Sequence, residues 1–464
     1  MRGNESATRR GRIRNGELRP RPVSQYTKLW IALLFSITIV SHAVAGQVKP
    51  AAVILGHSTI TLNGPWTFHV GDDPRWAQPG FDDSGWEHVD LTAPPGATDG
   101  DVGIGNYAPG WTAKGHPRYH GFAWYRIRLN VSPAGDEGLA LLGPWAVDSS
   151  YQAYVNGTLL GGFGDFSGPT PSAHGYQYPR MFALPAQGGP LVIAIRAWMG
   201  PWGAAGNGGI HVAPAIGAQN DIAAQYRLQW LTIFEGYAGD ATLGLLFFLS
   251  AVVMLCLIPT DPGSRTYLWL AVALTLSGIQ RGNQAFFFWW EFETIQGFVI
   301  FISGLVGPFA LGAWLMAWRC WFKLDRPHWL PWAIAALTVA LILAQLLARP
   351  WLFDAEFPKA VVSGLRTLIS VVRLAFLLTL ALIIVLGVRR GGRDAWFALP
   401  AALASMVVLF PGELAETGLP GIWFPWGIGV SLSEYASAAL VVLLCVPVLR
   451  KLWSHAPRAA STLA

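Results

Sequence analysis

The stretch from Ala238 to Ile258 reads AGDATLGLLFFLSAVVMLCLI. A helix of this length rises 1.5 Å per residue and therefore spans about 30 Å, the thickness of the hydrocarbon core of a bilayer. Six later stretches have the same apolar character: Tyr267–Phe288, Ile295–Trp318, Trp329–Ala348, Val362–Val388, Trp396–Leu414 and Trp426–Leu449. The sequence therefore predicts a membrane protein with a seven-helix all-α transmembrane bundle over residues 236–450.

Composition agrees with a membrane-embedded portion. The 464 residues are 53% hydrophobic and only 13% charged, with a mean hydropathy of +0.39, which is too apolar for an ordinary soluble protein. The long apolar stretches all follow Gln229, whereas Gln47 to Gln229 is rich in Gly, Pro, Asp and Trp. Two domains that face different solvents are predicted.

The N-terminus has the pattern of an export signal. Basic residues run from Arg2 to Lys28 and are followed by the apolar stretch Leu29–Val40 and by Ala43-Val44-Ala45. We expect a signal peptide over residues 1–45, which would deliver residues 46–235 outside the cytoplasm. If it were not cleaved, the apolar stretch would remain as an additional anchor.

The cations between the apolar stretches predict the orientation. The loops and tail expected inside hold ten of them: Arg265, Arg319, Lys323, Arg326, Arg389, Arg390, Arg393, Arg450, Lys451 and Arg458. The outer loops offer mainly Arg349 and Lys359. This bias predicts a multi-pass inner-membrane protein with its N-terminal domain outside and a short cytoplasmic tail over residues 451–464. The net charge of +5 is thus assigned to topology and to lipid contact, with no nucleic-acid partner.

The exported domain shows the pattern of an all-β fold. Short alternating runs such as Ala123–Val131, Tyr151–Val155 and Leu191–Ala197 are separated by Gly, Pro and Asp turns. Alternation predicts that Arg126 and Arg128 face water. Asn156-Gly157 is the residue pair that a tight hairpin needs. An antiparallel sandwich is predicted, without disulfides, because Cys256, Cys320 and Cys445 all lie in or beside the later apolar stretches.

Six segments carry a family resemblance. They are Leu62-Asn63-Gly64-Pro65-Trp66-Thr67-Phe68-His69, Gly71-Asp72-Asp73-Pro74-Arg75-Trp76-Ala77, Phe81-Asp82-Asp83-Ser84-Gly85-Trp86, Trp124-Tyr125-Arg126, Tyr154-Val155-Asn156-Gly157 and Ile193-Ala194-Ile195-Arg196. They resemble the sugar-binding jelly roll, a galactose-binding-like fold, of glycoside hydrolase family 2. In those hydrolases the jelly roll is an accessory module, and the catalytic carboxylates lie in a separate barrel.

The whole arrangement resembles the bacterial seven-transmembrane receptors with diverse intracellular signalling modules, above all the membrane-bound serine phosphatases that regulate sigma factors. The resemblance implies signal transduction by a receptor. Those proteins continue into a cytoplasmic phosphatase, kinase or cyclase domain, whereas here only Arg450 to Ala464 follow the last apolar stretch. We therefore expect a separate effector that docks on the basic inner loops around Arg319–Arg326 and Arg389–Arg393.

Ligand-binding residues are expected in two irregular, Trp-rich segments of the exported domain. Sugar recognition combines an aromatic face with polar groups that bind hydroxyls. The candidates are Trp111, Arg118, Tyr119, Trp198, Trp202, Asn207 and His211. The alternative is that these segments pack against the helices. Trp66, Trp76, Trp86 and Trp124 are assigned to packing, and the pairs Asp72-Asp73 and Asp82-Asp83 to turn capping.

The sequence lacks the usual signatures of catalysis. The histidines show no metal-ligand spacing, no Gly-x-Ser-x-Gly elbow or kinase signature is present, and the Gly-rich loops lack a nucleotide-binding Lys-Ser/Thr. The sequence therefore predicts no enzymatic activity, no cofactor and no metal site.

Charged residues inside the apolar stretches are the remaining candidates. Arg281, Arg373 and Glu434 each lie about 10 Å below the outer surface when counted at 1.5 Å per residue. We expect an Arg373–Glu434 or Arg281–Glu434 ion pair, since a charge in hydrocarbon is costly unless paired. For Arg281 and Arg366, snorkelling to the interface is the alternative.

Three functions remain open at this point. The first is a receptor whose exported domain binds a carbohydrate-like or protein ligand. The second is a transporter or membrane enzyme with a carbohydrate-binding appendage. Gly304, Gly307 and Pro308 interrupt the third apolar stretch, but no equivalent break that would indicate a transporter repeat is found in a second half. The third is a truncated phosphatase-linked receptor without output. The oligomeric state is also left open.

Overall fold

The computed structural model describes residues 59–100, 103–131, 138–173, 175, 177–185, 189–201, 208–260, 265–353, 357–418, 421–423 and 429–460. The predicted signal peptide lies outside these residues. The described strands and helices belong to one compact unit of the chain.

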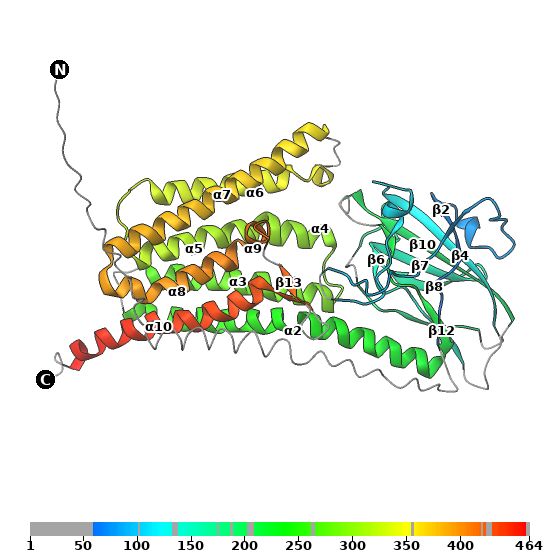
Figure 1. The fold of residues 1–464 in the computed structure, drawn as a ribbon, viewed down its shortest axis with the longest axis horizontal. Coiled ribbons are helices and arrows are strands. Elements are labelled where there is room, and N and C mark those ends of the chain that lie inside the picture. The colour runs from blue at the N-terminus through cyan, green and yellow to red at the C-terminus, as the bar shows by residue number, and fades with distance from the viewer. Residues whose placement is uncertain are drawn as a thin grey trace, which may run out of the picture. The chain divides into compact units, whose positions relative to one another are not determined.

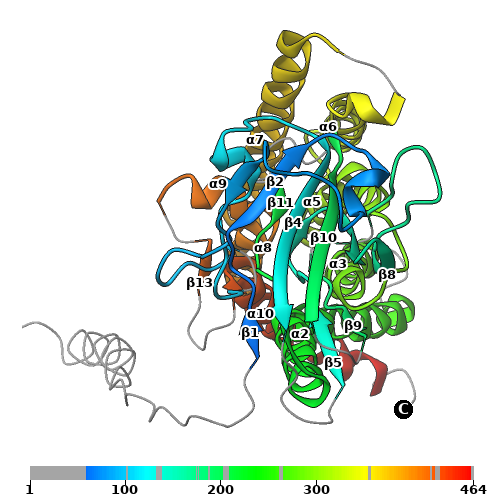
Figure 2. The ribbon, with the colours of Figure 1, turned by 90° about the vertical axis from the view of Figure 1, so that its right-hand side faces the viewer.

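Two antiparallel sheets form the N-terminal region. The larger has the order β3 (Glu87–Val89), β2 (Trp66–Val70), β4 (Gly121–Val131), β10 (Gly189–Met199), β7 (Ser150–Val155) and β8 (Thr158–Phe163). The smaller has the order β1 (Ile60–Thr61), β12 (Ala215–Ala218), β5 (Leu139–Leu142) and β9 (Met181–Ala183). Figure 2 shows β2, β4 and β10 side by side. The predicted sandwich is confirmed.

The core of the sandwich lies between the two sheets. Tyr125 of β4 and Ile193 of β10 pack there against Leu141 of β5 and Ile216 of β12. These residues follow the alternation that the sequence shows, because successive side chains of a strand point to opposite faces. The predicted hairpin is also confirmed: β7 pairs with β8, and Asn156 and Gly157 between them have φ values of 47° and 83°.

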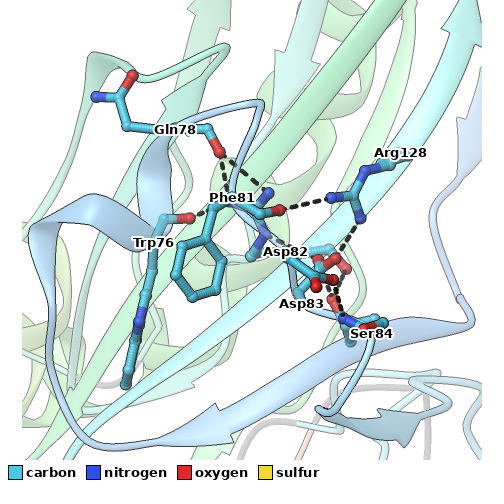
Figure 3. A network of polar contacts seen from close by, with 9 residues as sticks. Trp76, Gln78, Phe81, Asp82, Asp83, Ser84 and Arg128 are labelled. Atoms are coloured by element: carbon cyan, nitrogen blue, oxygen red, sulfur yellow. Dashed lines mark hydrogen bonds and ion pairs between the residues drawn. The ribbon is translucent and has the colours of Figure 1, made fainter.

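The segment that contains Asp83 covers the outer face of the larger sheet, which corrects the prediction for Arg126. Asp83 accepts hydrogen bonds from Arg126 Nε at 2.9 Å, Arg128 Nη1 at 2.5 Å and Thr67 Oγ1 at 2.8 Å. Figure 3 shows Arg128 reaching both this carboxylate and the backbone oxygen of Phe81. Arg126 is fully buried, so the prediction that it faces water is wrong.

The Asp pairs divide between two roles. Asp73 and Asp82 cap turns, as predicted, by accepting from the backbone N–H groups of Arg75 at 2.9 Å and Ser84 at 3.1 Å. Asp83 instead forms the buried ion pair with Arg126, and Asp72 forms an ion pair with Arg196 at 2.5 Å. Turn capping is therefore the wrong assignment for Asp72 and Asp83. Each of these two carboxylates ties an early loop to the sheet.

The helical region follows the sandwich directly (Figure 1). Its long helices are α2 (Gln219–Leu257), α3 (Thr266–Trp289), α5 (Gly307–Trp321), α6 (Leu330–Leu347), α7 (Lys359–Arg390), α8 (Gly392–Leu409) and α10 (Leu432–Ala460). Shorter elements are α4 (Ile295–Phe298), the π-helical segment η5 (Val299–Val306) and α9 (Pro411–Ala415). A shared hydrophobic cluster that includes Phe247, Trp314, Phe376 and Leu440 holds these helices together.

Each of the seven predicted stretches overlaps a helix, but five helices among the described residues are long and apolar enough to cross a membrane. Their spans are Gln219–Thr260, Ile295–Trp321, Leu330–Leu347, Lys359–Arg390 and Leu432–Arg450. Ala395–Leu409 is a shorter apolar helix. Helix α3 is not among the five because Gln280, Arg281, Asn283 and Gln284 lower its hydropathy.

Two helix boundaries differ from the predictions. Helix α2 begins at Gln219, well before the expected start of the bundle at residue 236, and its polar N-terminal part contacts β5, β9 and β12 of the sandwich. The last helix begins at Leu432, after β14 (Val430–Ser431) has paired with β13 (Ile422–Trp423). Gly429, directly before β14, contributes to the late start, because glycine disfavours helix. This helix also continues to Ala460, past the predicted start of the tail.

Replacing Gly244 with leucine should destabilise the chain by about 1–3 kcal/mol through overpacking. A Cβ atom at Gly244 of α2 would lie 2.9 Å from the Gly282 nitrogen and 3.3 Å from the Gly278 oxygen of α3. Thermal unfolding of the purified chain in detergent measures the effect. Gly364→Leu in α7 is the control, because a Cβ there meets nothing within 4 Å. Equal melting temperatures for the two variants would contradict the close packing of α2 and α3.

Candidate functional site

Trp111, a predicted ligand contact, lies in the core of the sandwich. It begins the short helix η2 (Trp111–Lys114), is 2% exposed, and packs against Phe68 and Tyr119. The Tyr119 hydroxyl donates to the Phe122 carbonyl at 2.5 Å and accepts from the Gly71 N–H at 3.1 Å. Trp111 and Tyr119 therefore stabilise the sandwich, and the indole of Trp111 presents no face to solvent.

Trp198 and His211 are also buried. Trp198 belongs to strand β10, not to an irregular segment, and packs against the helical residues Tyr237 and Phe287. His211 stacks on Tyr107 with ring centroids 4.5 Å apart, and its Nδ1 lies 3.0 Å from the Ala108 oxygen. Trp198 therefore packs against the helices, which was the alternative stated for these segments in the sequence analysis.

The remaining candidates do not complete a site. Arg118 is exposed and has a φ of 66°. Trp202 and Asn207 lie outside the described residues. The predicted ligand contacts that the structure describes therefore lie in different parts of the sandwich: Trp111 and Tyr119 in one hydrophobic cluster and Trp198 in another. The sequence could not show this, because burial depends on residues that are distant along the chain.

The three charged residues predicted within the helices come together around one cavity of about 330 Å³. Arg281 projects into it from α3, Arg373 from α7 and Glu434 from the start of α10. Asp240 of α2, Gln280 and Gln284 of α3, and Ser433 of α10 line the same space. Arg281, Arg373 and Glu434 thus line one cavity, and this cavity is the candidate functional site.

The predicted ion pairs with Glu434 are wrong. Arg281 Nη1 instead binds Asp240 Oδ1 at 2.7 Å, and Arg373 binds Glu413 of α9 through Nε and, at 2.8 Å, through Nη2. Arg373 Nη2 also donates to the Leu409 carbonyl at 3.2 Å. Asp240 and Glu413 are the functional residues that the sequence analysis missed. Each is an acid within one of the predicted apolar stretches, which is a signal in itself, because ionisable groups are rare in membrane helices.

Glu434 has a different structural role. Its backbone N–H donates to Ser431 Oγ at 3.2 Å, and its Oε2 accepts from the Ser431 N–H at 3.3 Å. This reciprocal pair is a capping box, which satisfies backbone donors at the first turn of α10. The carboxylate also lies close to α2, since a Cβ at Gly239 would be 3.6 Å from Oε2. Glu434 thus fixes the start of α10 at the cavity.

A polar stripe on α3 forms one wall of the cavity. Ser277, Gln280, Arg281 and Gln284 have the spacing i, i+3, i+4 and i+7, which places them on one face of a helix. Charged and amide groups therefore face the same cavity, where they can bind a polar molecule. Among the described residues, no three His, Cys, Asp or Glu side chains gather into a metal-binding group.

Comparison with known proteins gives distant matches. No protein-family model matches the sequence. A β-galactosidase of Bacteroides ovatus is 29% identical over 116 residues, which are 25% of this chain and 13% of that protein. Bacteroides uniformis β-glucuronidase 2 is 22% identical, covering 35% of this chain and 18% of its own, with a TM-score of 0.26. A glycosyl hydrolase family 2 member from Bacteroides cellulosilyticus is 18% identical over 34% of this chain and 20% of its own, with a TM-score of 0.24.

These matches correct one expectation and support another. The expectation that the chain is not an enzyme is contradicted by the sequence match to a β-galactosidase. The chain spans 13% of the length of the curated relative. The resemblance to the glycoside hydrolase family 2 jelly roll is supported. The matched 25% of this chain is distantly similar in sequence to that β-galactosidase.

Proposed function

We propose that the chain is a transmembrane receptor of the inner membrane. Its exported sandwich binds a carbohydrate-like or protein ligand, and a seven-helix bundle passes the resulting change to a separate cytoplasmic effector. The five membrane-length helices and the cations of the predicted inner loops support this placement.

The observation that carries the proposal is a hydrophobic cluster shared by the sandwich and the helices. Its sandwich members are Ile104, Trp145, Ala173 and Trp198, and its helical members are Ile233, Tyr237, Ala285, Phe287, Phe288 and Ile295. All are at least 90% buried. Because tightly packed side chains transmit displacement, a shift of Trp198 in β10 would be felt by α2 and α3.

Polar contacts reinforce this junction. Arg180 of the sandwich forms an ion pair with Glu291, which follows α3. The Ile295 N–H at the start of α4 donates to the Ala173 carbonyl at 2.9 Å. Tyr178 meets Trp230 of α2 edge to face, with centroids 4.7 Å apart. The sandwich is therefore connected to three successive helices.

Partly exposed aromatic rings offer a surface for a sugar. Trp76 and Trp86 are half-buried on the sandwich, with ring centroids 5.1 Å apart, and His69 lies against both. An aromatic face of this kind stacks on the apolar side of a pyranose. The matched relatives are a β-galactosidase and a β-glucuronidase, so galactosides and glucuronides are the first ligands to test.

A galactoside or glucuronide should bind the purified full chain saturably and change the labelling rate of Cys320, which is half-buried in α5. Intrinsic tryptophan fluorescence measures binding, and the rate at which a thiol reagent labels Cys320 measures the change in the helices. Trp86→Ala should weaken binding about tenfold, a loss of roughly 1.4 kcal/mol, by removing one stacking face. Trp332→Ala, which changes an exposed tryptophan of α6, is the matched control.

The possible results separate the two halves of the proposal. Binding that leaves the Cys320 labelling rate unchanged would contradict transmission while keeping a sugar-binding sandwich. If no sugar of the panel bound, the carbohydrate ligand would be rejected.

A further inference from the structure

We propose that the cavity bounded by α2, α3, α5, α7 and α10 is a second ligand site, which binds a small zwitterion carrying an ammonium group and an acidic group. This site is distinct from the sandwich surface and does not depend on a sugar ligand. It rests on the proposed placement of the helices in a bilayer.

Both signs of charge face the cavity. The side chains of Arg281 and Arg373 are 18% and 27% exposed, and those of their partners Asp240 and Glu413 are 7% and 24% exposed. Each arginine is therefore already balanced by one carboxylate, and the third carboxylate, Glu434, lies in the first turn of α10, where the helix dipole favours a negative charge. A ligand with a net charge would leave an uncompensated charge in a medium of low dielectric constant, which is costly. A zwitterion adds no net charge and can bind both kinds of group.

The arginines and the carboxylates can each bind one end of such a ligand. The hydrogen bonds of Arg373 to described residues use Nε and Nη2, so Nη1 can donate to an acidic group. Arg281 donates from Nη1 to Asp240 and from Nη2 to Ser437 Oγ at 3.4 Å, so its Nε can also donate to an acidic group of the ligand. Carboxylates have about four lone-pair sites, so Asp240 and Glu434 can accept from an ammonium in addition to their present bonds.

The neutral walls suit a polar occupant. Gln280 and Gln284 of α3, with Ser431 and Ser433 beside Glu434, place amide and hydroxyl groups around the space. Polar side chains in membrane helices are costly, so their convergence on one cavity indicates a purpose beyond packing. A volume of about 330 Å³ would be shared by roughly ten water molecules, which is room for a molecule the size of an amino acid.

Irregular backbone borders the same space. The π-helical segment η5 ends at Val306, and both Ile302 of η5 and Gly307, the first residue of α5, line the cavity. A Cβ at Gly307 would lie 3.1 Å from the Ile302 oxygen and 3.8 Å from Gln280 Nε2. π-Helical segments within α-helices are rare and are frequently found at functional sites, which agrees with a ligand at this position.

Two sources could supply the zwitterion: a soluble molecule such as an amino acid, or the headgroup of phosphatidylethanolamine. The first arm titrates the full chain in maltoside detergent with glutamine, glycine and O-phosphoethanolamine, using calorimetry and melting temperature. Acetate and ethylamine test each charge alone. The second arm compares melting temperatures in nanodiscs of phosphatidylethanolamine and of phosphatidylglycerol.

We expect at least one zwitterion to raise the melting temperature saturably and to bind at least about tenfold more tightly than acetate or ethylamine. Arg373→Gln should weaken that binding about tenfold or more. Arg366→Gln, on the same helix but exposed and outside the cavity, should not. Gln284→Leu keeps every charge and should also weaken binding, which serves as the second variant if Arg373→Gln does not fold.

A response in one arm alone supports the site and identifies its source. A response in neither arm, equal binding of acetate or ethylamine, or an equal loss of binding in Arg366→Gln would overturn the proposal. Because no sugar is used, these outcomes are independent of the sandwich ligand.

Discussion

Replacing Asp240 with alanine is expected to lower the free energy of unfolding by about 3–5 kcal/mol, because it removes the partner of a buried charge. The carboxylate is 2.7 Å from Arg281 Nη1, and the side chains of Asp240 and Arg281 are 7% and 18% exposed. Without Asp240, the guanidinium would keep its desolvation cost and lose its compensating charge. Unfolding of the purified chain in mixed micelles titrated with dodecyl sulfate, followed by tryptophan fluorescence, measures the loss.

Two further variants isolate the cause. The double variant Asp240→Asn/Arg281→Gln removes both charges and should recover most of the lost stability. Glu235→Ala removes an exposed acid from the same helix and should change stability by less than about 0.5 kcal/mol. If Asp240→Ala behaved like Glu235→Ala, the ion pair would not be structural.

Replacing Asp83 with alanine should destabilise the sandwich by a similar amount, about 3–5 kcal/mol, because Arg126 would remain buried without a carboxylate. Thermal unfolding followed by circular dichroism in the β region measures this loss. Asp82→Ala, at the neighbouring exposed turn, is the matched control and should have a much smaller effect. A normal melting temperature for Asp83→Ala would contradict the contacts in Figure 3.

The same carboxylate makes stability depend on pH. Burial raises the pKa of Asp83, but hydrogen bonds from Arg128, Arg126 and Thr67 outweigh it and hold the pKa below the ordinary value of 3.8. A depressed pKa contributes stability that is complete above the unfolded value and is lost as the pH falls through the folded value. The melting temperature of the native chain should therefore decrease as the pH drops below about 4. The share of this decrease that comes from Asp83 should be absent in Asp83→Ala.

The sandwich shows what local sequence patterns can and cannot predict. Alternation correctly assigned Tyr125 to the core and Arg126 to the opposite face of the sheet, and Asn156-Gly157 predicted its hairpin. Alternation identifies the face of a sheet but not what covers that face. Here the segment of Asp83, more than 40 residues earlier in the chain, covers Arg126. Its burial is therefore a tertiary effect that strand periodicity does not contain.

The helices show a similar limit. Counting residues along each apolar stretch predicted one depth for Arg281, Arg373 and Glu434, and the structure places all three around one cavity. Depth does not determine which way a side chain points around its helix. The two arginines are instead bound by Asp240 and Glu413. Trp111 and Trp198, predicted as ligand contacts, are buried instead. Aromatic composition alone does not distinguish a binding surface from a core.

Helix α2 runs for 39 residues from its contacts with the sandwich to Leu257, without an intervening linker. Each residue of a helix turns it by about 100°, so the azimuth of the sandwich end is locked to that of the other end. An insertion of one residue would rotate the two by more than a quarter turn, whereas seven residues would nearly restore the phase. The length of this helix can therefore change without rotating its two ends relative to each other only by nearly whole numbers of turns. The helix also contains no flexible segment that would absorb a twist of the sandwich before the twist reaches the cavity.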